Sequence, residues 1–309
     1  MTSGDSQAPW TDEQWALVRQ AVQKEASRSR VAATFLPLYG PLAGDADFVR
    51  NERLKYDWAS PPPSPLPKGW PQTMSVDDRT VIPLTTLQVR VYLRGAQVAD
   101  SKLTSALEMF RRAANVLARL EDAIVFRGQK GENEGPDSND IEVLPAIWTV
   151  RGGEKSDGLL GNLPFAKRAP ITKPLDFGQD LIQQVSEKIG KLEGKGHFGP
   201  FAVVLGQTLF GDAQAASAAL VLPSDRIIPF LGGGPLLRSS TLPDEEGIVV
   251  ALGAAPVELV VATDVSVGFL QVTTDPHFVF RVFEKIALRI KESGAIEHLK
   301  RQKPGSPAK

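Results

Sequence analysis

A long amphipathic helix is the feature that most restricts how this chain can fold. Asp100 or Ser101 is placed to cap its start, and Gly128 can end it because glycine accepts the backbone conformation of a helix C-terminus. The apolar positions between them recur at helical spacing: Leu103, Leu107, Phe110, Ala114, Leu117 and Ile124. This stripe predicts a helix that packs along the core of its domain.

Composition removes several classes of protein. A chain of 309 residues with 42% hydrophobic residues can bury a substantial core without metals or disulfides. The net charge of -1 offers no basic excess for phosphate, which makes a nucleic-acid partner unlikely. Cysteine is absent, so thiol chemistry is excluded. No apolar run approaches the ~20 residues that cross a bilayer, and we expect a cytoplasmic protein with no membrane partner.

A second amphipathic helix is predicted from Thr11 to Arg30. Thr11 and Gln14 have the spacing of a capping box, and Trp10 is placed to pack on Trp15 as a staple. One face carries the apolar residues Trp15, Val18, Val22 and Ala26. Two interpretations stay open: an ordinary helix that packs on the core, and a surface helix whose stripe meets a partner.

The remaining elements predict an α+β fold. A helix is expected over 177–192, and strands are expected over 81–93, 201–205, 248–252, 257–262, 265–272 and 278–283. The proline-rich stretch 55–74, with Trp58 and Trp70, predicts an extended arm. The polar and basic stretch 291–309 predicts a flexible tail.

No catalytic constellation is found. The histidines His197, His277 and His298 are far apart in sequence, and no metal-ligand spacing occurs. There is no G-x-S-x-G elbow, and the glycines near Lys191 lack phosphate-loop spacing. The sequence therefore predicts a protein that is not an enzyme, with no catalytic or metal site.

Several ordered blocks resemble one family, the family 1 encapsulins. They are TDEQWALVRQAVQKEASRSRV, IPLTTLQVRVYL, LARLEDAIVFRG, GHFGPFAVVLG, VELVVATDVSVGFLQV and FVFRVFEKIAL, and they span roughly Thr11 to Ile290. The resemblance implies the fold of tailed-phage major capsid proteins. It divides the chain into a lumen-facing N-terminal helix and arm (1–54), an extended loop (55–89), a peripheral domain with the spine helix (90–126), an axial domain (127–247), the peripheral return (248–290) and a flexible tail (291–309).

This resemblance also implies a function. Many copies would form an icosahedral nanocompartment that encapsulates a cargo enzyme through a C-terminal targeting peptide. Family cargoes include ferritin-like proteins, dye-decolorising peroxidases and other redox enzymes. The cargo-peptide groove would involve Trp15, Val18, Val22, Val31, Asp264 and Phe269, and a pore loop would contain Asp212, Ala213 and Ser217. Some family members bind flavin, but no position here matches well enough to assign one. The charged residues of the spine helix would face neighbouring subunits or the lumen.

Two other functions are weighed. A major capsid protein of a phage or prophage would share the fold and enclose DNA. A bacteriocin-like or proteolytic enzyme would belong to a different class, and the missing nucleophile and base argue against it.

Overall fold

The computed structural model describes residues 10–56, 74–137, 147–161, 177–215, 221–275 and 277–301. Its helices are α1 (Asp12–Ser29), α2 (Ala32–Phe35), α3 (Gly95–Val98), α4 (Thr104–Arg127), α5 (Gly158–Gly161), α6 (Phe177–Gly194), α7 (Gln207–Gln214) and α8 (Pro223–Ile227), with short 3-10 turns at Ile228–Leu231 and Ser293–Ala295. The strands are β1 (Leu38–Tyr39), β2 (Phe48–Arg50), β3 (Arg53–Tyr56), β4 (Met74–Asp77), β5 (Val81–Pro83), β6 (Thr85–Arg94), β7 (Trp148–Gly152), β8 (Phe201–Leu205), β9 (Leu236–Arg238), β10 (Glu246–Ala251), β11 (Val257–Val272), β12 (His277–Ile290) and β13 (Ile296–Lys300).

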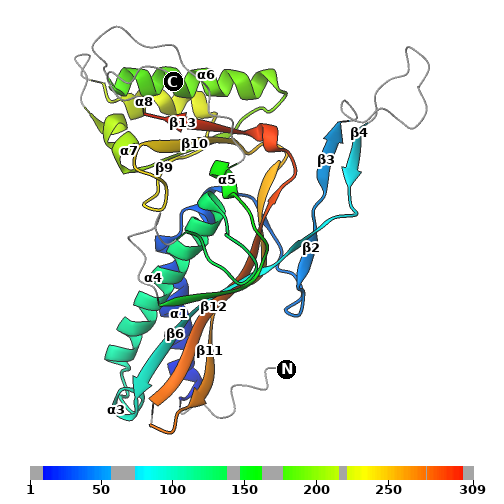
Figure 1. The fold of residues 1–309 in the computed structure, drawn as a ribbon. Coiled ribbons are helices and arrows are strands. Elements are labelled where there is room, and N and C mark those ends of the chain that lie inside the picture. The colour runs from blue at the N-terminus through cyan, green and yellow to red at the C-terminus, as the bar shows by residue number, and fades with distance from the viewer. Residues whose placement is uncertain are drawn as a thin grey trace.

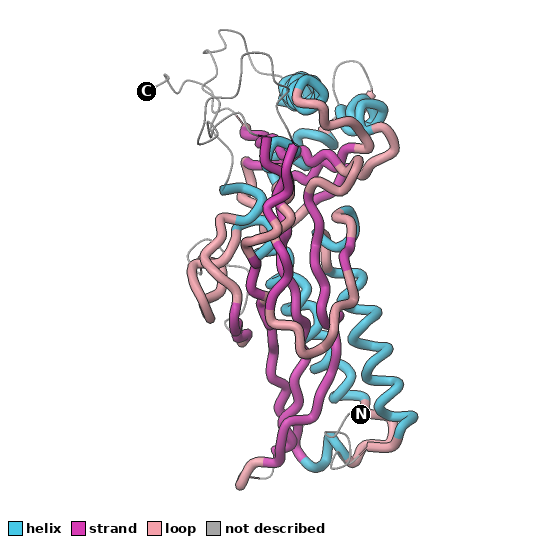
Figure 2. Tube along the Cα trace, turned by 90° about the vertical axis from the view of Figure 1, so that its right-hand side faces the viewer, coloured by secondary structure: helices cyan, strands magenta, loops and turns pink. Residues whose placement is uncertain are grey.

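Two sheets lie at opposite ends of an elongated molecule (Figure 1). The lower one has five strands in the order β1-β11-β12-β6-β7, and the upper one has four in the order β13-β10-β8-β9. The strands of the first sheet run side by side along much of the molecule in Figure 2, with helices on one face. The α+β architecture expected from the sequence is therefore present.

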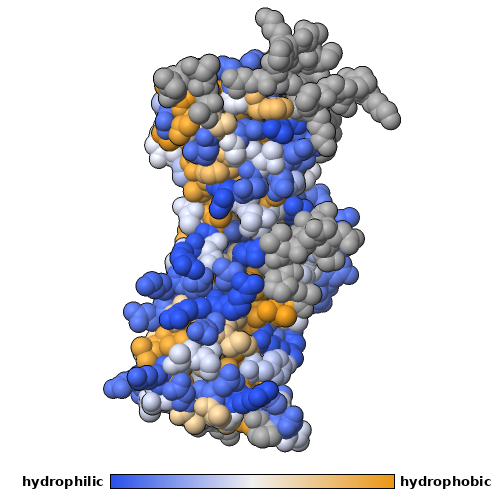
Figure 3. Space-filling view, turned by 90° about the vertical axis from the view of Figure 1, so that its left-hand side faces the viewer, coloured by the Kyte–Doolittle hydropathy of each residue, from blue (hydrophilic) through white to orange (hydrophobic). Residues whose placement is uncertain are grey.

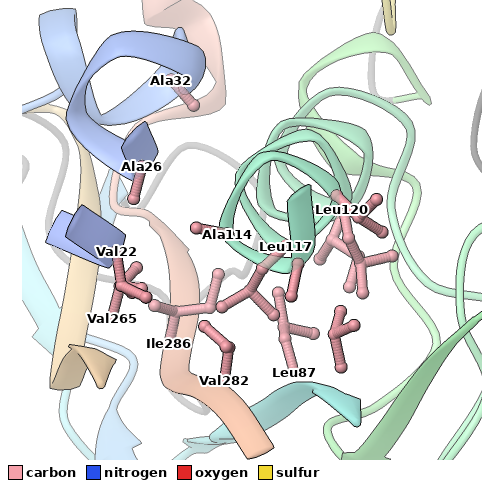
Figure 4. Packing of buried hydrophobic residues seen from close by; sticks show 14 of the residues in the cluster. Val22, Ala26, Ala32, Leu87, Ala114, Leu117, Leu120, Val265, Val282 and Ile286 are labelled. Atoms are coloured by element: carbon pink, nitrogen blue, oxygen red, sulfur yellow. The ribbon is translucent and has the colours of Figure 1, made fainter. Parts of the chain in front are cut away.

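The main core fills the space between this five-stranded sheet and the helices α1 and α4. Figure 4 shows Val22 of α1 and Leu117 of α4 meeting Leu87 and Val282 from the sheet. All four side chains are 0% exposed. At the far end of α1 four rings gather around Phe280, which stacks on Trp10 at 4.5 Å and meets Phe110 at 5.5 Å.

All three predicted helices form, as α1, α4 and α6, with one shift. Thr11 and Gln14 make the capping box of α1, and the rings of Trp10 and Trp15 lie 5.2 Å apart. Gly128 ends α4 with a φ of 85°, and a Cβ there would lie 1.9 Å from Ser156 O. The start of α4 differs: Leu103 takes the left-handed conformation, so the helix begins at Thr104, whose N–H donates to Asp100.

The strand predictions needed three corrections. Leu84 divides the predicted strand 81–93 into β5, which pairs with β2, and β6, which pairs with β12. The two strands expected over 257–272 form one strand, β11, with bulges that absorb the polar stretch around Asp264. β10 joins β8 in the upper sheet, although the sequence grouped it with β11 and β12.

The predicted flexible tail was wrong for residues 296–300. They form β13, which pairs antiparallel with β10 and buries Ile296 and Leu299 to 1% and 0% exposure. Ile296 and Leu299 are three residues apart, so they point to opposite faces of β13, and each joins a different buried cluster, Ile296 that of the main core and Leu299 that beside α6. Ion pairs add to the contact. Glu297 binds Lys188 in the neighbouring helix α6 and Lys195, which directly follows that helix. Residues 302–309 lie outside the described part of the chain.

A two-stranded arm, β3 with β4, projects from the body (Figure 1). The proline-rich stretch predicted to form its tip falls largely on residues 57–73, which lie outside the described residues. The base of the arm is held by Arg289 of β12, which is only 1% exposed. Its guanidinium binds Glu258, donates to Arg50 O at 3.0 Å and lies 3.3 Å from Glu52. One buried cation therefore joins the arm to the sheet.

Candidate functional site

The C-terminal end of α1 brings an unforeseen charged cluster together with two of the predicted groove residues, Val31 and Asp264. Arg30, the residue that closes α1, extends its guanidinium in two directions. Nη2 donates to Asp264 on β11 at 3.1 Å, and Nη1 lies 3.6 Å from Glu121 Oε2 on α4. Because Asp264 keeps 59% of its side chain exposed and Glu121 is fully buried, Arg30 connects the surface to the interior.

Asp122 anchors the turn that follows α1. Its carboxylate accepts the Val31 N–H at 2.9 and 3.0 Å and the Ala32 N–H at 2.7 Å. These N–H groups open the short helix α2, so the side chain serves as a cap supplied from a distant helix. Burial and the charge of Glu121 raise the pKa of Asp122, while the two backbone donors oppose that shift.

Glu121 and Glu284 form a buried pair beneath Arg30. Their exposures are 0% and 1%, and among the described residues no N–H or hydroxyl group donates a hydrogen bond to any of their four carboxyl oxygens. Burial raises the pKa of Glu121 to about 7 against the opposing charge of Arg30. Burial and the charge of Glu121 raise the pKa of Glu284 well above its usual value. Two acids with raised pKa values thus face each other in an apolar core.

The structure places the six predicted groove residues along the contact between α1 and β11. Three of them, Trp15, Val18 and Val22, are buried and belong to the core. Val31 and Phe269 are partly buried and pack against that core, and Asp264 is exposed. Trp15 and Phe269 meet the same ring, Phe280, at 6.0 and 5.3 Å. The three residues of α1 therefore support this surface from behind, and a role in cargo binding stays a prediction.

The predicted pore loop is helical over its first part. Asp212 and Ala213 lie in α7, where Ala213 is buried and Asp212 accepts two hydrogen bonds from Arg301 at 2.8 and 3.0 Å. Small residues here suit close packing against α6 and α8 as well as they suit a turn. Ser217 lies outside the described residues, and the pore role stays a prediction.

The spine helix α4 carries its charges on two sides. Glu108, Arg111 and Arg112 are exposed as expected. Figure 3 shows the side of the molecule on which α4 lies, and hydrophilic side chains cover most of its middle. Glu121 and Asp122 contradict the expectation, because both are buried.

Two clefts flank the base of the arm. One, of about 450 Å³, is lined by Arg53 and by Gln129, Lys155 and Ser156, and the other, of about 410 Å³, by Glu52 and Lys291. No histidine lines either cleft. Within the described ranges no group of three His, Asp or Glu residues has the geometry to hold a metal ion. In the same part of the chain, no helix has both the length and the apolarity needed to cross a membrane.

Comparison with known proteins places the chain in a family. The model of the family described as Linocin_M18, Encapsulating protein for peroxidase, matches residues 3–135 and 150–287. The chain belongs to the encapsulin family. It is 25% identical over 300 residues to the type 1 encapsulin shell protein EncA of Myxococcus xanthus strain DK1622, a match that covers 95% of this chain and 94% of that protein. The resemblance expected from the sequence blocks is confirmed.

Solved structures share the encapsulin fold of the chain. The virus-like particle of Pyrococcus furiosus matches with a TM-score of 0.65 and 15% identity, over 93% of this chain and 100% of that one. The capsid of Myoviridae phage XM1 matches with a TM-score of 0.57 and 14% identity, over 86% and 90% of the two chains. The predicted kinship of this fold with phage capsid proteins is confirmed.

Proposed function

We propose that this encapsulin assembles with copies of itself into a closed icosahedral shell in the cytoplasm and has no catalytic activity of its own. The family match over residues 3–135 and 150–287 carries the proposal. An elongated subunit with a projecting arm supports it, because an arm of this kind can reach a neighbouring copy. Contacts of fixed geometry between identical subunits close only under point symmetry.

Electron microscopy of the purified full-length chain tests this assembly. We expect closed particles of uniform diameter, and light scattering should give the mass of a large homo-oligomer. Monomers or small oligomers alone would contradict the proposal. Ultraviolet absorbance of the particles distinguishes the alternative, because a phage capsid protein would retain nucleic acid after nuclease treatment, whereas an enzyme compartment should not.

The proposed shell encloses a cargo enzyme, and the contact of α1 with β11 is its docking surface. The family description names peroxidase as what is encapsulated, so a dye-decolorising peroxidase is the first cargo to try, with ferritin-like and other redox enzymes next. Around Arg30 the surface presents the exposed Asp264 carboxylate and the partly buried Val31, and the partly buried Phe269 lies further along β11, toward the start of α1. Such a surface suits a short peptide with aliphatic anchors and a basic residue.

Substitution of Asp264 by asparagine tests the docking surface. Loss of one charged hydrogen-bond acceptor at the surface is worth about 1.5 kcal/mol, so we expect roughly tenfold less peroxidase in purified particles of unchanged size. Co-expressed peroxidase is quantified by its haem absorbance per shell subunit. The matched control is Asp275→Asn, an exposed carboxylate at the far end of the β11–β12 hairpin, which should leave loading unchanged.

Deletion of the cargo's own C-terminal peptide is the second arm of this experiment. It should abolish loading into the wild-type shell. If Asp264→Asn and wild-type shells load equally, and peptide deletion still abolishes loading, the peptide must dock at another surface of the shell interior.

A further inference from the structure

We propose that Glu121 and Glu284 share one proton and form a pH-sensitive latch that fixes the end of α1 to the core. The latch regulates the docking surface above it, and in that respect it rests on the proposed function. It tightens as protons are bound and loosens as they are removed.

The geometry requires a proton between these groups. Glu121 comes from α4 and Glu284 from the inner face of β12, and the two carboxyl groups lie within hydrogen-bonding reach of each other. Ionised carboxylates accept hydrogen bonds and cannot donate them, so two ionised partners would leave all four oxygens unsatisfied in the core. One proton turns one carboxyl group into a donor, and a charge-assisted hydrogen bond can then join the two side chains.

The charges around Glu121 and Glu284 make loss of the shared proton unfavourable. Arg30 is the cation that faces it, from the end of α1, and Arg30 also binds Asp264 of β11. Asp122, the other acid on this part of α4, adds a further negative charge. The Arg30 guanidinium therefore faces Glu121, Glu284 and Asp264, and Arg119 of α4 interacts with Asp122. Loss of the shared proton leaves like charges opposed at low dielectric.

The direction of the pH effect follows from the raised pKa values. An unfolded glutamate ionises near its ordinary pKa of about 4.3, whereas in the folded chain the pKa of Glu121 is raised to about 7 and that of Glu284 well above its ordinary value. The folded state thus holds protons that the unfolded state has lost. The stabilisation is complete below the ordinary pKa of glutamate and is lost as the pH rises through the folded values. The two groups titrate as one coupled pair.

The latch acts where the docking surface begins. Movement of Glu121 away from Arg30 frees the guanidinium that holds Asp264. The adjacent Asp122 accepts hydrogen bonds from the N–H groups of Val31 and Ala32. Loosening of the Glu121–Glu284 pair therefore affects the turn after α1 through the ion pairs of Arg30 and the hydrogen bonds of Asp122. We expect alkaline conditions to disorder this turn before the rest of the core.

Hydrogen–deuterium exchange of assembled full-length shells tests the latch. The readout is the protection of residues 26–35 between pH 5 and 9, after correction for the intrinsic rate. In the wild type, the opening constant should rise up to about tenfold per pH unit for each linked proton. Glu284→Gln and Glu121→Gln each supply a permanent amide donor, so both should flatten the profile. Glu108→Gln, an exposed carboxylate on the same helix, is the matched control and should keep the wild-type slope.

The outcomes separate this inference from the proposed function. A wild-type slope retained in both Glu284→Gln and Glu121→Gln overturns the latch, even where shells form and load cargo. Absence of shells at every pH overturns the proposed function instead. Infrared spectroscopy of the wild type gives a measurement that needs no variant. A carboxylic-acid C=O band should persist at neutral pH, and its absence at pH 6 also overturns the latch.

Discussion

Replacement of Phe280 by alanine is expected to lower the free energy of unfolding by about 4 kcal/mol. Its ring is 0% exposed and touches the rings of Trp10, Trp15, Phe110 and Phe269 at centroid distances of 4.5, 6.0, 5.5 and 5.3 Å. Removal of the ring leaves a cavity that α1, α4 and the sheet all border, and rigid helices can collapse into it only in part.

Phe283→Ala is the matched control for this substitution. Phe283 lies on the opposite face of the same strand, is partly exposed and packs its ring under Arg281 at 4.1 Å. We expect a loss of about 1 kcal/mol there, because less apolar surface is buried and no internal cavity forms. Chemical denaturation at one protein concentration measures both variants. Equal losses would mean that the aromatic cluster is not the centre of the core.

Arg289→Met is expected to cost about 3–5 kcal/mol and to release the base of the arm. The substitution keeps the apolar length of the side chain but leaves Glu258, which is 4% exposed, with only Lys291 at 3.0 Å. The carbonyl of Arg50 also loses its donor, and Tyr39 loses the cation that lies 4.2 Å from its ring. Assembly should suffer more than folding, because the arm would no longer leave the body at a fixed angle.

Lys285→Met on the same strand is the control for the buried cation. Lys285 pairs with Asp47 at 2.8 Å, but Asp47 is 82% exposed, so the loss should stay within about 1 kcal/mol. Thermal unfolding and electron microscopy of the two variants are compared side by side. A normal yield of closed particles from Arg289→Met would show that the arm is held by other contacts.

Local sequence signals predicted the elements that depend on near neighbours. The capping box of Thr11 and Gln14 and the helix stop at Gly128 need only a few residues, and both formed as expected. The strand expected over 81–93 formed in its second part as β6, where Leu87, Val89, Val91 and Leu93 alternate on the buried face. The topology of the two sheets could not be predicted from such local signals, because the pairing of β13 with β10 joins residues far apart in the chain.

The acidic cluster could have been found from periodicity alone. Glu121 falls four residues after Leu117 and three before Ile124, directly on the apolar stripe of α4. Glu284 alternates with Val282 and Ile286 on the buried face of β12. Glu121 was expected at the surface with the other charges of the spine helix, because glutamate is seldom buried, and no prediction was made for Glu284. An acidic residue on the buried face of each of two separate elements, α4 and β12, was the sequence signal for a functional or strained contact.

The place of β13 in its sheet also sets a time at which the subunit becomes competent. β13 forms one edge of the four-stranded sheet, whose other strands, β8, β9 and β10, lie between residues 201 and 251. During synthesis the hydrogen-bonding groups along one side of β10 stay open until residue 300 has been added, several seconds later at ordinary rates of translation. Nascent chains on one messenger therefore carry an unfinished upper sheet until the residues of β13 have been made.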